Sequence, residues 1–166
     1  YTAGKDKVSL LINDNVFTAR MGPDTIYTRI IDEKFPDYES VIPKDNDKEL
    51  KVDRKELLAA VKRVSIFSNK TTQQVAIKTE KSKLIITTED PEKASKAHEE
   101  LEVSYEGDSI EIGFNATYLK DVLSHINSQE TILKLNTPIS ASLFYPEKNS
   151  EDETVSMLLM PIRLNE

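Results

Sequence analysis

The sequence predicts an α+β fold in which two helices pack on antiparallel sheets, built from two copies of one strand–helix–three-strand unit. Two segments, residues 53–68 and 115–126, have the three-and-four apolar spacing of amphipathic helices. Almost every other apolar segment is short and has the composition of a strand. The two helical segments also repeat each other at an offset of 62 residues, caps included. These three observations define the predicted fold class.

Each predicted helix has a start signal and one apolar face. The first follows Asp53, a good N-cap, and Glu56 three residues later can complete a capping box. The second follows Asn115, which is also a good cap. In the repeat, Val52, Asp53, Leu57, Ala60, Val61 and Val64 correspond to Phe114, Asn115, Leu119, Val122, Leu123 and Ile126.

The repeat extends beyond the helices. A short strand precedes each helix (KELKV and SIEIGF), and three strands follow each one, so that the unit occurs twice between about residues 45 and 164. One unit cannot bury both its helix and its sheet, whereas two packed together can. The alternative is a chance similarity of two amphipathic helices. The other predicted strands are KVSLLI, VFTARM, TIYTRII, QVAIKT, KLIITTE, HEELEVSY, TILKLN, SASLFY and VSMLLMPI.

The N-terminal region, residues 5–32, reads as three strands joined by two turn signals, Asn13-Asp14-Asn15 and Gly22-Pro23-Asp24. These strands look like the last three of a third unit whose first strand and helix are missing. We therefore expect the chain to begin in the middle of a domain through truncation. The alternative is a natural three-strand extension that pairs with a partner.

Composition excludes several classes of protein. The 166 residues are 38% hydrophobic and 31% charged, which is typical of a globular protein. No signal peptide is recognisable, the longest apolar run is too short to cross a bilayer, and there are no cysteines. We therefore expect a cytoplasmic protein with no membrane partner. The net charge of −7 argues against a protein that simply coats nucleic acid, although a local basic face can persist within it.

No catalytic or metal-binding constellation emerges from the sequence. His98 and His125 lie on different predicted elements and are interpreted as surface residues. Residues 92–111 carry seven acids against two lysines but lack the glycine spacing of a calcium-binding loop. The four glycines form no phosphate-binding pattern. We therefore expect no enzyme, no metal and no cofactor.

Residues 34–43, KFPDYESVIP, contain the pattern FPDY-x-x-V-x-P. This segment resembles the linker between the second and third domains of the bacterial β sliding clamps, the processivity factors of DNA polymerase III. Ser-Asn-Lys at residues 68–70, Ile-Gly-Phe-Asn at 112–115 with Tyr118, and the terminal MPIRL at 160–164 also match, in the same order. The resemblance covers nearly the whole chain. Glu39 and Ser40 depart from it where arginine is frequent, and Thr72 where some members have an aromatic residue.

The resemblance implies a DNA-clamp fold with pairs of β-α-β-β-β units, helices lining a central hole and sheets forming the outer wall. Residues 1–44 would be the trailing strands of the middle domain plus a linker, and residues 45–166 the complete C-terminal domain. The whole protein would encircle double-stranded DNA non-specifically as a ring-forming homodimer. It would bind DNA polymerase and clamp-loader subunits through their short peptide motifs. The alternative function is a free-standing protein-interaction domain without DNA encirclement.

The resemblance also implies two sets of site residues. A basic helix face is more often a solvated surface, but a sliding clamp favours weak phosphate contacts there. The expected DNA-facing residues are Arg54, Lys55, Lys62, Arg63 and Lys120. The C-terminal run reads either as a buried strand or as the wall of a docking groove, since Pro161 interrupts pairing and methionine suits varied partners. The expected peptide-binding residues are Pro36, Val41, Asn115, Tyr118, Ile139, Leu158, Met160, Pro161, Ile162, Arg163 and Leu164.

Overall fold

In the computed structural model, which describes residues 7–150 and 152–164, the chain divides into two units, Tyr1–Asp37 and Tyr38–Glu166. The first unit contains the strands β1 (Ser9–Ile12), β2 (Val16–Met21) and β3 (Asp24–Arg29) in one antiparallel sheet. Residues 5 and 6 of the predicted segment lie outside the described residues. Only β2 has buried side chains, while β1 and β3 are exposed throughout. The apolar residues of β1 and β3 are therefore left uncovered in the described part of this unit.

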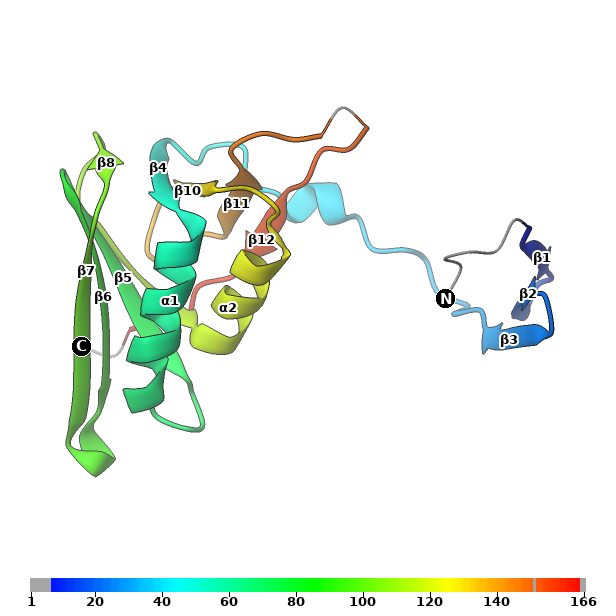
Figure 1. The fold of residues 1–166 in the computed structure, drawn as a ribbon, viewed down its shortest axis with the longest axis horizontal. Coiled ribbons are helices and arrows are strands. Elements are labelled where there is room, and N and C mark those ends of the chain that lie inside the picture. Colours follow the sequence, from blue (N-terminus) through cyan, green and yellow to red (C-terminus); the bar gives the residue numbers. More distant parts are fainter. Residues whose placement is uncertain (1–6, 151, 165–166) are drawn as a thin grey trace. The chain divides into compact units, whose positions relative to one another are not determined.

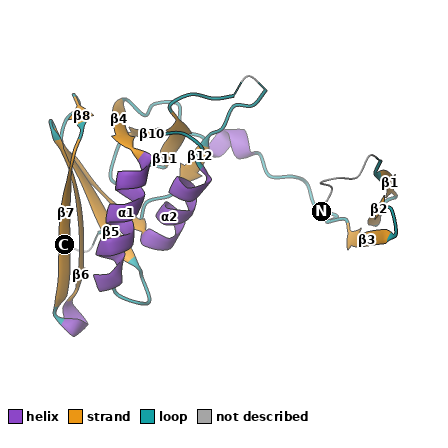
Figure 2. Ribbon diagram, in the orientation of Figure 1, coloured by secondary structure: helices purple, strands orange, loops and turns teal. Residues whose placement is uncertain are grey.

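The second unit follows the predicted order of strand, helix and three strands, twice (Figures 1 and 2). Its elements are η1 Tyr38–Val41, β4 Lys48–Asp53, α1 Arg54–Val64, η2 Ser65–Phe67, β5 Gln74–Glu80, β6 Lys83–Asp90, η3 Pro91–Lys93, β7 Ser95–Glu102, β8 Ser104–Tyr105, β9 Ile110–Asn115, α2 Ala116–His125, β10 Glu130–Leu135, β11 Ser142–Pro146 and β12 Met157–Leu159. The helices lie side by side, which confirms the predicted architecture.

Both predicted N-caps form. The Asp53 carboxylate accepts a hydrogen bond from the Glu56 backbone N–H at 2.9 Å. The Asn115 side chain accepts hydrogen bonds from the backbone N–H groups of Thr117, at 2.9 Å, and Tyr118, at 3.4 Å. Each cap satisfies donors at a helix start that have no partner within the helix. The first predicted helix is shorter than its periodicity indicates, because the chain tightens into η2 after Val64.

The two repeats exchange their first strands. β4, from the first repeat, pairs with β10, and β9, from the second repeat, pairs with β5. The results are a five-stranded sheet, in the order β12-β11-β10-β4-β8, and a four-stranded sheet, in the order β7-β6-β5-β9. Each sheet thus contains strands of both repeats. Neither repeat can complete its sheet without the other, which is the structural reason why the unit occurs twice.

The 62-residue offset holds only for the first strand and the helix. Val52 pairs with Thr131 and its counterpart Phe114 pairs with Val75, so the strands after the helices are offset by 56 residues (131 minus 75). The connection to the next strand has nine residues after α1 (65–73) and four after α2 (126–129), and α1 is itself one residue longer than α2. This longer connection contains η2 and a turn at residues 68–73.

Two segments that the sequence predicts as single strands are divided between the sheets. Residues 98–105 belong to β7 up to Glu102, and the chain then crosses to the five-stranded sheet, where β8 pairs with β4. Residues 155–162 contain only β12, and the chain then crosses to the four-stranded sheet, where Ile162 bridges to Gly113 on β9. Pro161, which has no backbone donor, lies at the second crossing.

The core lies between the helices and the two sheets. Phe114 on β9 and Phe144 on β11 meet edge to face at its centre, with ring centroids 6.2 Å apart, and so join the two sheets. Arg54 joins the two helices at the edge of this core. Its guanidinium donates hydrogen bonds to the carbonyls of Leu123, at 3.1 Å, and Ser128, at 2.9 Å. A cation near the N-terminus of a helix is repelled by the positive end of that helix's dipole. The Arg54 guanidinium is instead attracted by the negative, C-terminal end of α2.

We predict that Arg54→Ala lowers the free energy of unfolding by about 2 kcal/mol, because hydrogen bonds from a charged donor to a partly buried carbonyl are worth about 1.5–3 kcal/mol. Urea denaturation followed by circular dichroism measures the change. Lys55→Ala is the matched control, since Lys55 is the exposed neighbour on the same helix, and its effect should stay within about 0.5 kcal/mol. Equal losses for the two variants would contradict the structural role of Arg54.

Candidate docking surface and helix face

The helix face carries the residues expected to approach DNA. Lys55 and Lys62 on α1 are exposed, and neither forms an ion pair within the described residues. Lys120 on α2 is half-buried, with its ammonium 3.4 Å from the Ser65 hydroxyl. Arg54 differs from these lysines, because its guanidinium is engaged by the carbonyls at the end of α2. The face therefore offers fewer available cations than the sequence indicates.

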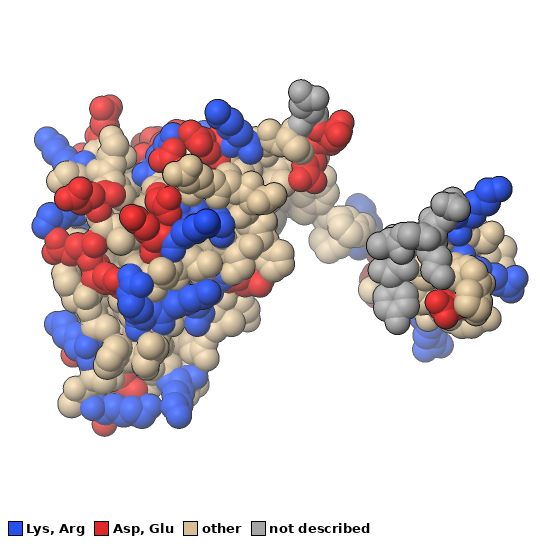
Figure 3. Space-filling model, viewed as in Figure 1, with Lys and Arg blue, Asp and Glu red and all other residues tan. Residues whose placement is uncertain are grey.

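Arg63, the last expected cation, forms an ion pair with an acid of the neighbouring sheet. Its Nε lies 2.9 Å and 3.3 Å from the two carboxylate oxygens of Glu99 on β7, and a second guanidinium nitrogen also binds Glu99. Hydrogen bonding to Glu99 raises the pKa of Arg63 above its usual value. Figure 3 shows acids over β7, beside Lys and Arg side chains on the helix face. The charge of Arg63 is thus largely compensated within the chain.

Successive acids of β7 point to opposite faces of the sheet, as in any strand. Glu100, next to Glu99, binds Lys83 on β6 at 2.5 Å and lies 3.1 Å from His98. Lys83, and then His98, hold the pKa of Glu100 below its usual range. The other histidine, His125, lies on α2 beside the backbone carbonyl of Asp121. The structure therefore does not bring the two histidines into one site.

The C-terminal segment forms an apolar surface at the edge of the second unit. β12 pairs with β11 at the edge of the five-stranded sheet, and Leu158 on it is half-buried. We call residues 160–164, which follow it, the strap. Met160 is 60% exposed, whereas Pro161, Ile162 and Leu164 are partly buried. The segment is therefore not a fully buried strand, the first of the two interpretations that the sequence allows, because part of its apolar surface is exposed.

The strap passes close to the start of α2. Ile162 bridges to Gly113, which lies two residues before the N-cap Asn115. Tyr118, in the first turn of α2, is 62% exposed, and α2 also contacts β12. The structure thus brings Asn115, Tyr118 and the C-terminal residues to one end of the unit.

The turn before β5 is attached to the same helix start. The Gln73 carbonyl accepts a hydrogen bond from Ala116 N–H at 2.8 Å, and the Thr72 carbonyl accepts one from the Asn115 side chain at 3.2 Å. The side chains of Gln73 and Thr117 also bind each other. Gln73 adopts a positive φ of 48°, a conformation that is uncommon for residues other than glycine. Sequence reasoning gave no role to Gln73, because its signal is a backbone angle.

Three other expected peptide-binding residues lie outside this cluster of contacts. Val41 ends η1 and is 61% exposed. Ile139, 63% exposed, lies in the turn that leads into β11, whose residue Ser142 pairs with Leu159. Ile139, just before β11, and Met160, just after β12, therefore lie at the same end of this strand pair. Pro36 is exposed and belongs to the first unit, Tyr1–Asp37.

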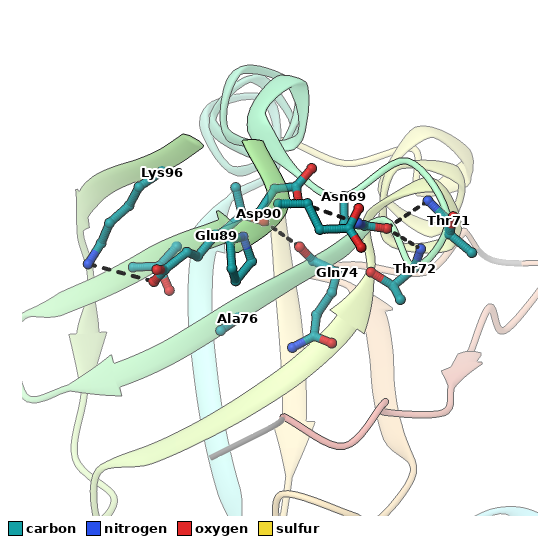
Figure 4. A pocket seen from close by; sticks show the side chains of 12 residues that line it. Asn69, Thr71, Thr72, Gln74, Ala76, Glu89, Asp90 and Lys96 are labelled. Carbon is teal, nitrogen blue, oxygen red and sulfur yellow. Dashed lines mark hydrogen bonds and ion pairs between the residues drawn. The ribbon is translucent and has the colours of Figure 1, made fainter. Parts of the chain in front are cut away.

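A pocket of about 760 Å³, lined mostly by polar residues and missed by sequence reasoning, lies at the end of the four-stranded sheet (Figure 4). Its residues include Asn69, Thr72, Gln74, Glu89 and the fully buried Asp90. The Asn69 amide donates a hydrogen bond to one oxygen of Asp90 at 3.4 Å, and Lys93 lies 3.5 Å from the other. No group of three or more His, Cys, Asp or Glu that could hold a metal occurs among the described residues.

None of the helices in the described part of the chain is long and apolar enough to span a membrane. The candidate functional surfaces of the second unit are the helix face and the strap with its surroundings. Together with the exchanged repeats, they define the class of protein: an α+β domain of the sliding-clamp fold.

Comparison with known proteins specifies the family. The family described as "DNA polymerase III beta subunit, C-terminal domain" matches this chain over residues 39–163. The beta sliding clamp of Pseudomonas putida is 36% identical over 157 residues, covering 95% of this chain and 42% of the clamp. The sliding clamp structure from Pseudomonas aeruginosa superposes with a TM-score of 0.86 at 33% identity, covering 95% and 42%. A sliding clamp structure from Bartonella birtlesii bound to griselimycin superposes with a TM-score of 0.87 at 30% identity, covering 95% of this chain and 41% of that clamp.

The chain belongs to the DNA polymerase III beta subunit family, the bacterial sliding clamps. It spans 42% of the length of the relatives from both Pseudomonas species.

We predict that Asn115→Ala destabilises the second unit by about 1 kcal/mol, the usual effect of removing an N-cap. The substitution removes the acceptor for the Thr117 and Tyr118 N–H groups and the donor to the Thr72 carbonyl. Urea denaturation measures the loss. Asn127→Ala, an exposed amide just after α2, is the control and should change stability by less than about 0.5 kcal/mol. Indistinguishable midpoints would disprove the cap's contribution.

Proposed function

We propose that this chain is the C-terminal part of a sliding clamp, a processivity factor that encircles DNA as a ring and docks polymerase and clamp-loader peptides. The observation that carries the proposal is the match over 95% of the chain to proteins named as sliding clamps, in sequence and in structure. In this proposal residues 45–166 form the whole C-terminal domain. Residues 1–44 are the trailing strands of the middle domain and the linker.

The exposed three-stranded sheet supports this division. Leu11, Ile12 and Tyr27 each expose more than 60% of their surface, which is unusual for an isolated domain. The remaining strands and the helix of a middle domain would cover them. The complete protein is proposed to be a homodimer that closes the ring in the cytoplasm. It binds and tethers, and it catalyses no reaction.

The charge distribution of the helix face supports weak contact with DNA. A protein that slides needs non-specific phosphate contacts without base readout. The exposed Lys55 and Lys62 supply such contacts, and the compensated Arg63 adds little. The net charge of −7 leaves this chain little electrostatic affinity for DNA, so the proposal assigns retention to ring closure.

The strap and its surroundings are proposed as the docking site for partner peptides. Its exposed apolar side chains, among them Tyr118, Ile139 and Met160, can pack against apolar peptide residues. Methionine adapts its shape to different partners. In the second unit the proposed site contains Val41, Asn115, Tyr118, Ile139, Leu158, Met160, Pro161, Ile162, Arg163 and Leu164. Pro36, in the first unit, is added to the proposal on the resemblance alone.

We predict that the 166-residue chain does not hold linear duplex DNA at physiological salt and binds it only at low salt. There, Glu99→Gln should strengthen binding by releasing Arg63 to the phosphates. One additional phosphate contact should steepen the dependence of log affinity on log salt by about 0.9. A fluorescence anisotropy titration at several salt concentrations measures both quantities.

Glu100→Gln is the matched control, because it removes the same charge from the same strand but frees Lys83 on the other face. Its salt dependence should stay close to that of the unmodified chain. If both variants steepen the slope equally, the effect is one of net charge and Arg63 is not a contact. Submicromolar binding by the unmodified chain at physiological salt would contradict topological retention.

We also predict that deleting residues 160–164 from the complete protein weakens its binding to short peptides of Gln-Leu-x-Leu-Phe-like pattern. The loss should be at least about 2 kcal/mol, the threshold of an interface hot spot. The 166-residue chain should bind such peptides more weakly than the complete protein, because in this proposal the upstream part of the middle domain supplies the other wall. Titration of a labelled peptide measures the affinities, and circular dichroism monitors the helices.

Ile66→Ala serves as the control, since Ile66 is another exposed apolar side chain, 76% exposed, on η2. Its peptide affinity should match that of the unmodified protein. Unchanged affinity after the deletion would show that the strap is only a structural segment, and the docking site would have to lie elsewhere.

A further inference from the structure

Gly113 lies where the strap crosses between the two sheets. β12, which leads into the strap, belongs to the five-stranded sheet, and β9, which carries Gly113, is an edge of the four-stranded sheet. The Ile162 N–H donates a hydrogen bond to the Gly113 carbonyl at 2.8 Å, within an isolated antiparallel bridge. The strap therefore connects the edges of both sheets.

The backbone conformation of Gly113 does not require glycine. Gly113 lies within an ordinary strand, and the one glycine with a positive φ among the described residues is Gly22. Its neighbours Ile112 and Phe114 point into the core, so residue 113 faces away from it. A side chain at this position would be compatible with the strand itself.

The strap occupies the space that a side chain at residue 113 would need. A Cβ built on Gly113 would lie 2.5 Å from the Ile162 carbonyl oxygen and 2.8 Å from Leu164 Cδ2, closer than real Cβ atoms approach other atoms. The first of these atoms belongs to the backbone, so a rotamer change cannot remove the overlap. The glycine thus allows the strap to approach the β9 backbone directly.

The repeat supplies an internal comparison. At the 62-residue offset, Gly113 corresponds to Lys51 on β4, and β8 pairs with Lys51 through Ser104 just as the strap pairs with Gly113 through Ile162. Each crossing leaves the third strand after a helix and reaches the first strand of the same repeat, which lies in the other sheet. Lys51 has a full side chain, which binds Glu130 and Glu147. The fold therefore tolerates a side chain at this point of the repeat, and the need for glycine comes from the strap.

We propose that Gly113 is the positioning residue of the peptide site: it attaches the strap directly beside the start of α2 and so places Met160 and Tyr118 on one surface for an extended apolar peptide. This inference rests on the proposed docking function. Gly113 itself does not contact the peptide. A methyl group there would push the strap off β9, break the Ile162 bridge and separate the two halves of the surface, while both helices keep their core contacts.

The test is Gly113→Ala in the complete protein. Affinity for the Gln-Leu-x-Leu-Phe-like peptide should fall by about tenfold or more. Amide exchange at Ile162, measured without peptide by mass spectrometry or NMR, should become faster because this bridge opens. Circular dichroism should remain unchanged. Gly107→Ala is the control for steric overlap away from the strap: its Cβ would lie 2.4 Å from the hydroxyl of the buried Tyr105 ring, and both peptide affinity and Ile162 exchange should be retained.

Leu164→Ala, which adds no atoms, provides a second variant in case Gly113→Ala does not fold. It removes the strap side chain that covers Gly113, so Ile162 should again exchange faster. The inference is overturned if Ile162 still exchanges slowly in the folded variants and Gly113→Ala keeps its peptide affinity. This holds even if deletion of the strap abolishes binding. If strap deletion leaves affinity unchanged, the docking function itself fails, and the loss of Ile162 protection in Gly113→Ala would then mark only a structural attachment.

Discussion

The pairing of β4 with β10 and of β9 with β5 is the interaction on which the rest of the second unit depends. Each pairing inserts the first strand of one repeat into the sheet of the other. Each helix therefore follows a strand of one sheet and packs against strands of both sheets. Because the exchange is reciprocal, the apolar faces of both helices and both sheets are buried in a single core, with Phe114 and Phe144 in contact at its centre.

The same exchange determines where the candidate surfaces lie. It brings α1 and α2 side by side, so their exposed sides form one face on which Lys55 and Lys62 are available. It also leaves β9 at a sheet edge, where the strap can pair with it. The proposed docking surface is thus made by residues that are distant in sequence, from the start of α2 to the end of the chain.

Charge compensation adjusts these surfaces without changing the fold. Arg54 binds the carbonyls at the end of α2, and Arg63 binds Glu99, so two of the five cations of the helix segments serve the chain itself. A weakly attractive face suits a protein proposed to move along DNA, because strong phosphate binding would hold it in place. Glu99 of β7 is therefore part of the function proposed for the helix face.

The sequence alone determined the elements and their order, because caps and apolar periodicity depend on residues within a few positions of each other. Asp53, Asn115 and the two apolar stripes specify the helices, and the 62-residue offset reveals the repeat. The tertiary structure decided what depends on distant neighbours: the exchange of β4 and β9 between sheets, the division of residues 98–105 and 155–162, and the role of Arg54. It also decided the steric constraint at residue 113, since the strap, folded back from some fifty residues away, occupies the space that a side chain there would need.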